Sequence, residues 1–101
     1  MSVKTLPAFN AVTFFQGFQK TATNIKLIWR PHSNLKVSWY RVERKMNGGE
    51  WMWIGTVKER MMAEYIDTNI IAGNRYDYRV IAIGFEHSFS QPSSTVSIVA
   101  R

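Results

Sequence analysis

The sequence contains no cysteine. Disulfide bonds and thiolate metal sites are therefore excluded, and no cysteine pattern indicates an oxidising compartment. No apolar run reaches about 18 residues, so we expect no transmembrane helix. No apolar core follows Lys4, so the beginning of the chain does not resemble a signal peptide. Acidic residues are few, since 7 Asp and Glu stand against 13 Lys and Arg, and the net charge of +6 favours acidic partners.

Side chains that would carry catalysis or bind metals are also scarce. The two histidines, His32 and His87, lie in expected loops without a carboxylate cluster beside them. A zinc site needs about four ligands at set spacing, and no nucleophile motif or glycine-rich phosphate loop occurs. We therefore expect no enzyme, no metal and no cofactor. Basic residues are scattered among acidic ones, which argues against nucleic acid as a partner.

Apolar and aromatic residues are plentiful, and they alternate. Hydrophobic residues make up 46% of the 101-residue chain, which is enough for the core of one domain. Alternation over short segments, with turn residues such as Asn47, Gly48 and Gly49 between them, predicts about seven strands. No segment sustains a helical period. The pattern predicts an all-β, antiparallel two-sheet sandwich.

One spacing predicts a specific contact. Ile70, Gly73 and Tyr76 follow each other at intervals of three and precede an alternating strand. This spacing is typical of a tyrosine corner, in which the tyrosine packs inward and its phenol hydrogen-bonds to the loop a few residues upstream. We expect Tyr76 to do so.

Motifs along nearly the whole chain carry a resemblance to a known family. They are Trp29 with Pro31, Tyr40-Arg41-Val42, Trp51, residues 65–70, Gly73, residues 76–82 and Ser90-Gln91-Pro92-Ser93. Together they resemble a fibronectin type III domain over residues 6–100, which leaves residues 1–5 as an N-terminal tail. The resemblance implies a seven-stranded immunoglobulin-like sandwich. One sheet would hold strands near 8–15, 24–30 and 64–69, and the other would hold 36–45, 50–57, 75–83 and 92–100.

The strands implied by this resemblance also predict which side chains form the core. Inward-facing apolar residues of the expected strands are Val12, Ile25, Leu27, Trp29, Tyr40, Val42, Ile70, Tyr76, Tyr78, Val80, Val96 and Ile98.

The stretch from Trp29 to Val37 carries a second resemblance. It is similar to a stretch of the fibronectin-like surface lipoproteins of campylobacters and their relatives, which reads Trp-Arg-Pro-His-Pro-Asp-Phe-Arg-Val. The first four residues and Val37 match, whereas residues 33–36 differ. Those lipoproteins are adhesins that bind host fibronectin. The resemblance implies binding of fibronectin or another matrix protein through Arg30, Pro31, His32, Ser33, Asn34, Leu35 and Lys36.

Chemistry limits which of these residues contact a partner. Trp29 and Val37 should belong to the core and to a strand. Arg30 and Lys36 would form charge-assisted hydrogen bonds to acidic groups, and His32 would add a donor. Since no Arg-Gly-Asp occurs, integrin binding is unsupported.

Strand parity predicts a second candidate surface. Trp39, Arg41, Arg79, Ile81 and Ile83 should point outward from one sheet, with Trp51 or Trp53 beside them. Trp and Arg are enriched in interface hot spots. This surface would contact either an external partner or a neighbouring type III domain of the parent chain.

These observations favour an extracellular or cell-surface binding module of a bacterial adhesin, whose parent would be an outer-membrane lipoprotein. Two alternatives stay open. One is a passive spacer of a multidomain exported protein, including an accessory module of a secreted glycan-degrading enzyme. The other is an inter-subunit structural module that uses the Trp and Arg surface.

Overall fold

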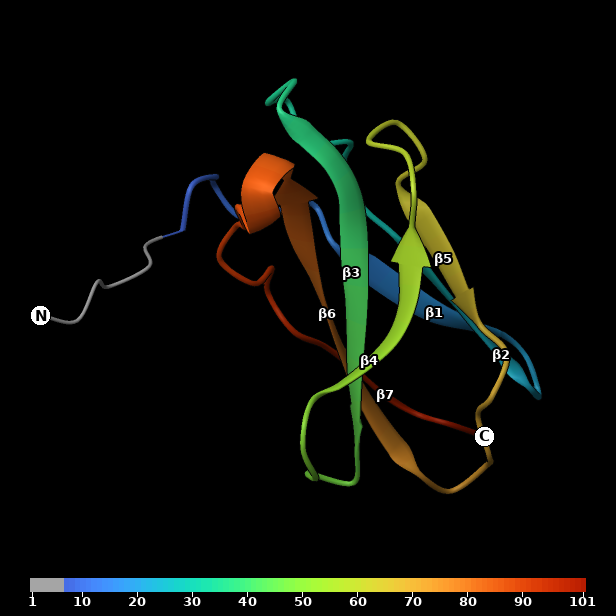
Figure 1. Ribbon diagram of the computed structural model, residues 1–101. Coiled ribbons are helices and arrows are strands. Elements are labelled where there is room, and N and C mark those ends of the chain that lie inside the picture. Colours follow the sequence, from blue (N-terminus) through green and yellow to red (C-terminus); the bar gives the residue numbers. More distant parts are fainter. Residues whose placement is uncertain (1–6) are drawn as a thin grey trace, which may run out of the picture.

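The architecture is a sandwich of two antiparallel sheets (Figure 1). The structure, a computed structural model, describes residues 7–101, so the predicted tail at residues 1–5 lies outside the described residues. The three-stranded sheet has the order β1 (Gln16–Thr21), β2 (Asn24–Ile28) and β5 (Glu64–Asp67). The four-stranded sheet has the order β4 (Met52–Val57), β3 (Val37–Met46), β6 (Arg75–Gly84) and β7 (Val96–Val99). This arrangement confirms the predicted fold class.

Helical structure in residues 7–101 is limited to a single 3-10 turn, η1 (Phe85–His87). No helix among these residues is long and apolar enough to cross a membrane. The long central strands β3 and β6 pair over most of their length, from Val37 opposite Gly84 to Met46 opposite Tyr76.

Side chains from both sheets form one core. Trp29 packs within it, with its ring centroid 5.3 Å from that of Tyr40 and 6.2 Å from that of Phe15. Ten of the predicted core residues are buried, while Val96 and Ile98 are only partly buried against the core. The structure adds Phe9, Phe15, Val37, Val57, Ala82 and Ala100.

The predicted first strand at residues 8–15 is wrong. Phe9, Val12 and Phe15 are buried at intervals of three, whereas Phe14 is exposed and has a positive φ of 55°. The strand is β1, farther along the chain. Its inward positions include Gly17, where an added Cβ would lie 2.8 Å from a Leu27 methyl group. Because the inward side of β1 lacks large apolar residues, alternation did not indicate it.

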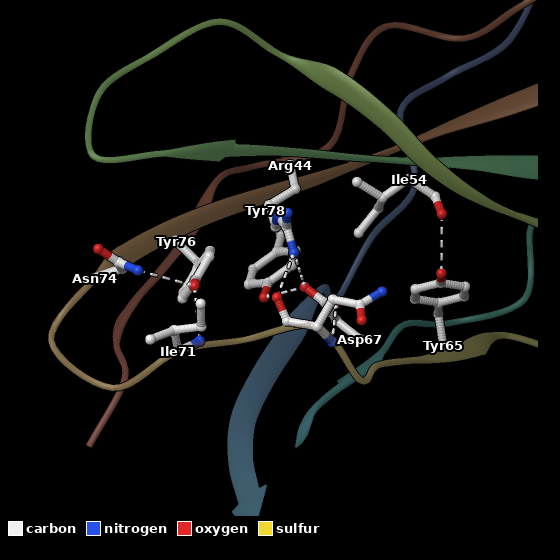
Figure 2. A network of polar contacts seen from close by, with 9 residues as sticks. Arg44, Ile54, Tyr65, Asp67, Ile71, Asn74, Tyr76 and Tyr78 are labelled. Carbon is white, nitrogen blue, oxygen red and sulfur yellow. Dashed lines mark hydrogen bonds and ion pairs between the residues drawn. The ribbon is translucent and has the colours of Figure 1, made fainter. Parts of the chain in front are cut away.

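The tyrosine corner is confirmed. The backbone N–H of Ile71 donates a hydrogen bond to the phenol oxygen of Tyr76 at 2.8 Å, and Asn74 Nδ2 donates to the same oxygen at 3.3 Å (Figure 2). The chain turns at Gly73, whose φ of 94° suits glycine. The corner fixes the loop that leads into β6.

A buried polar network joins the two sheets. The carboxylate of Asp67 on β5 accepts from Arg44 Nη1 on β3 at 2.8 Å and from the Tyr78 hydroxyl on β6 at 2.7 Å (Figure 2). Its second oxygen accepts from the backbone N–H of Asn69 at 3.1 Å. Burial and the hydrogen bond to Asp67 raise the pKa of Tyr78, so its hydroxyl stays a donor.

Two serines complete the edge of the four-stranded sheet beside β6. The Ser90 hydroxyl accepts from the backbone N–H of Ala82 at 2.8 Å, and the Ser93 hydroxyl accepts from that of Val80 at 2.9 Å. Pro92 lies between them and has no N–H for a regular ladder. The side chains therefore satisfy buried donors of β6 before β7 begins.

Candidate binding surfaces

The connection formed by residues 29–36 lies at one end of the sandwich. Figure 1 shows it between β2 and β3, at the same end as η1 and the β4–β5 connection. Hydrogen bonds to other segments fix the conformation of this connection, and most of them involve His32.

His32 is buried, with 8% of its surface exposed, and both ring nitrogens are bonded. Nε2 lies 2.7 Å from the carbonyl oxygen of Asn10, and Nδ1 accepts from the backbone N–H of Asn34 at 3.0 Å. A carbonyl can only accept and an N–H can only donate, so the ring has its proton on Nε2. Phe9 packs against the ring edge. The expectation that His32 presents a donor to a partner is wrong, because the ring is used inside the domain.

Backbone atoms of His32 tie the connection to a second loop. Its N–H donates to the Tyr40 hydroxyl at 2.8 Å, and that hydroxyl donates to the carbonyl of Arg60 at 2.6 Å. The Arg60 side chain returns a 2.8 Å hydrogen bond to the carbonyl of His32. Burial raises the pKa of Tyr40, which keeps its hydroxyl protonated as a donor. Residues 29–36 are thereby pre-organised.

The other predicted contacts of this connection are accessible. Leu35 is 81% exposed, Arg30, Ser33, Asn34 and Lys36 are exposed, and Pro31 is half-buried. Arg30 is braced by Phe14, whose ring centroid lies 4.2 Å from the guanidinium carbon. Two cations and one apolar side chain thus face solvent on a fixed backbone.

The second candidate surface, the outer face of the four-stranded sheet, is an aromatic and basic cluster. Trp39 stacks on Trp53 with ring centroids 5.9 Å apart and an interplanar angle of 16°. Arg41 also lies against the Trp53 ring, with its guanidinium carbon 5.5 Å from the centroid. Arg79 lies 4.2 Å from the ring centroid of Trp51. Trp53 of β4 and Trp51, which directly precedes β4, therefore both belong to this face.

An ion-pair bridge runs through this face. Glu43 Oε1 lies 2.7 Å from Arg79 Nε, and Oε2 lies 3.2 Å from Arg41 Nε. Ile81 and Ile83 lie on the same side but are buried beneath their neighbours, with 5% and 6% exposure. The prediction that these two isoleucines are accessible is therefore wrong, whereas Trp39, Arg41 and Arg79 keep part of their surface exposed.

A hollow of about 330 Å³ opens at one end of this face. Ile83 pairs with Trp39 of β3 and with Phe89, so these three residues form one row across the sheet. The hollow is lined by Trp39, Arg41, Trp53, Ile83, His87 and Phe89. Sequence reasoning missed His87 and Phe89, because the chain reverses through η1 to bring them beside β6.

The sequence pattern does not show on which face of the sheet Trp53 lies, because a β-bulge interrupts the alternation. The β3–β4 register shifts between Val42 and Glu43, which places Trp53 opposite Glu43 on the outer face. Its indole N–H donates to the carbonyl of Gly55 at 2.9 Å, with the Thr56 hydroxyl 3.2 Å away. These bonds fix the ring over the face while leaving 56% of Trp53 exposed.

Residues 7–101 bring together no group of three His, Cys, Asp or Glu side chains that would hold a metal ion. The candidate sites are surfaces of fixed shape, charge and aromatic character.

No protein-family model matches this sequence, and no curated protein matches it. Solved structures do match. Over 97% of this chain, the FN3 domain of human collagen XX is similar with 19% identity and a TM-score of 0.71, and the match covers 100% of that chain. Domains FN1–FN3 of chicken CNTN1 match 92% of this chain with 17% identity and a TM-score of 0.81. The fold is therefore that of a fibronectin type III domain.

A third similar structure is the β-1,2-glucanase from Parabacteroides distasonis. It matches 97% of this chain with 25% identity and a TM-score of 0.76. This chain spans only 13% of the glucanase and 32% of the CNTN1 chain. Domains of this fold thus occur as modules beside other domains.

Proposed function

We propose that this chain is a non-catalytic, extracellular binding module of a bacterial surface adhesin, and that it binds host fibronectin. The observation that carries the proposal is the connection at residues 29–36. Its backbone is fixed by His32 and Arg60, and it presents Arg30, Leu35 and Lys36 to solvent. The resemblance of this stretch to fibronectin-binding lipoproteins of campylobacters supports the choice of partner.

The physical basis of binding would be a pre-organised loop. Because the hydrogen bonds of His32 already order the backbone, little conformational entropy is lost when a partner docks. Arg30 and Lys36 would pair with acidic groups of the partner, and Leu35 would bury its exposed surface. The net charge of +6 would speed the encounter with an acidic region.

The test is binding of the purified chain to immobilised fibronectin by surface plasmon resonance. A double variant, Arg30→Ala with Lys36→Ala, should bind at least about tenfold more weakly, as expected when interface hot-spot residues are truncated. His32→Ala is unsuitable, because it would disturb the fold. Circular dichroism and melting temperature verify that each variant is folded.

The matched control is Lys20→Ala with Arg101→Ala, which removes the same charge. Lys20 is exposed near the turn of the β1–β2 hairpin, and Arg101 is exposed beside that hairpin, where its backbone N–H donates to Gln19 Oε1. Equal weakening by both double variants would indicate non-specific electrostatic attraction and contradict the assignment of the site. Absence of binding by the folded chain at tens of micromolar would contradict the proposed function.

A second candidate function is an accessory module of a secreted glycan-degrading enzyme, or a spacer within a multidomain exported protein. The similarity to a segment of a β-1,2-glucanase favours it. In that case the folded chain would bind no fibronectin.

A further inference from the structure

The hollow on the outer face of the four-stranded sheet has the composition of a ligand site. Three of its six lining residues are aromatic, namely Trp39, Trp53 and Phe89. Its volume of about 330 Å³ is near the lower limit of small-molecule pockets. Trp53 is held in place through its indole N–H. Its 56% exposure leaves much of the ring available as a flat apolar surface.

The charge of the hollow has one sign. Arg41 is the charged residue among those that line it, and no carboxylate is among them. The nearest acid on the face, Glu43, has one oxygen 2.7 Å from Arg79 and the other 3.2 Å from Arg41. Glu43 is not among the lining residues, so an occupant with a negative charge would meet Arg41 inside the hollow while Glu43 lies outside it, on the Nε side of the guanidinium.

Arg41 has donors to offer. They are not at Nε, which is buried and faces Glu43 Oε2 at 3.2 Å without an aligned hydrogen bond in the described part of the chain. The ion pair with Glu43 uses Nε, so among residues 7–101 it leaves the terminal nitrogens of Arg41 for a ligand, and a third of the side chain remains exposed (33%). A guanidinium with unused N–H groups binds carboxylates in two-pronged geometry.

We propose that this hollow binds a pyranose sugar that carries a carboxylate. The C–H face of the sugar ring would pack on the exposed surface of the Trp53 indole, beside Trp39, and the carboxylate would accept hydrogen bonds from the terminal nitrogens of Arg41. The site is separate from residues 29–36, so this inference stands apart from fibronectin binding. The shared chemistry fits a sialic acid or a hexuronic acid, and the test distinguishes the two.

The experiment is a titration of the 101-residue chain followed by the NMR signals of its indole N–H groups. The probes are 3′-sialyllactose, a hyaluronan tetrasaccharide, and lactose as the neutral control. We expect saturable shifts of the Trp39 and Trp53 signals with a Kd on the order of 1 mM for at least one acidic probe. The probe that binds identifies the source of the acidic sugar.

Variants locate the site. Trp53→Ala and Arg41→Gln should each weaken binding of the acidic probe by about tenfold or more, since one good aromatic or charged contact supplies that factor. Trp51→Ala is the matched control, because Trp51 lies on the same face but outside the hollow. It should change the Kd by less than about twofold.

Three results would overturn the proposal. The first is no shift with either acidic saccharide up to about 20 times the expected Kd. The second is equally strong binding of lactose, which would remove the role of Arg41. The third is an equal effect of Trp51→Ala and Trp53→Ala on a chain that melts normally, which would move the binding elsewhere on the face.

Discussion

Replacing Asp67 by alanine tests the inter-sheet network most directly. Asp67 is 3% exposed and accepts from Arg44, Tyr78 and the backbone of Asn69. Removing one partner of a buried ion pair typically costs about 3–5 kcal/mol, because the other charge stays desolvated. The Arg44 side chain keeps 20% exposure and gains some hydration. We therefore expect the lower value, about 3 kcal/mol.

This loss is large for a chain of this size. A domain of 101 residues is stable by roughly 5–15 kcal/mol, and each kcal/mol lowers Tm by about 4–8 °C. Asp67→Ala should thus lower Tm by about 15 °C while leaving the chain folded at room temperature. Urea unfolding followed by tryptophan fluorescence measures the free energy, with the m-value as a check on two-state behaviour.

Glu64→Ala is the matched control on the same strand. Its carboxylate lies 3.5 Å from Lys26 Nζ, but the two side chains are 56% and 27% exposed. Exposed pairs are screened by water, so the cost should be below about 0.5 kcal/mol. Equal losses of unfolding free energy for both variants, or a loss below about 1 kcal/mol for Asp67→Ala, would refute the reasoning that burial makes this ion pair costly to break.

Three further predictions concern single sites. Because burial and Asp67 raise the pKa of Tyr78, its protonated phenol stabilises the fold fully below about pH 10, and this contribution falls as pH rises further. Urea midpoints of the wild type should therefore decline toward those of Tyr78→Phe above that pH; a constant difference would contradict this. Gly55→Ala should cost about 1–3 kcal/mol, since its Cβ would overlap the Tyr65 ring. An unchanged melting curve would disprove the overlap. Ser93→Ala should cost about 1–3 kcal/mol by leaving the Val80 N–H without its hydroxyl acceptor, and hydrogen exchange at Val80 should accelerate. Slow exchange at that amide would argue against the role of Ser93.

Sequence predicted the parts of the fold whose signals are local. The corner at Tyr76 depends on a spacing within one loop, and β6 alternates apolar and polar residues from Tyr76 to Val80. β1 could not be found this way, because Gly17 and Gln19 occupy its inward positions and Phe18 is 48% exposed. What makes β1 a strand is its pairing with β2, a contact that alternation does not report.

The candidate surfaces depended on contacts between distant segments, and there sequence reasoning was less successful. His32 looked like a loop histidine, yet Phe9 and Asn10 enclose it from another segment. The hollow required both the β-bulge that turns Trp53 outward and the reversal that places Phe89 beside Ile83. Neither feature has a sequence signal strong enough to be predicted from one chain.

Burial accounts for most of the identity between residues 29–37 and the lipoprotein stretch. Of the five residues shared with the lipoprotein stretch, Trp29, His32 and Val37 are buried, and each packs or hydrogen-bonds inside the domain. Their identity is explained by folding alone. Residues 33–36, which are exposed, are those that differ.

The shared part of the surface thus reduces to Arg30 and the half-buried Pro31. If the two stretches bind the same partner in the same way, Arg30 carries the common contact, because a proline offers no donor. Arg30→Ala alone should then weaken binding to fibronectin more than Lys36→Ala alone, although both remove one charge. The reverse order in surface plasmon resonance would mean that the shared residues are a signature of the fold, and that any binding depends on the residues that differ.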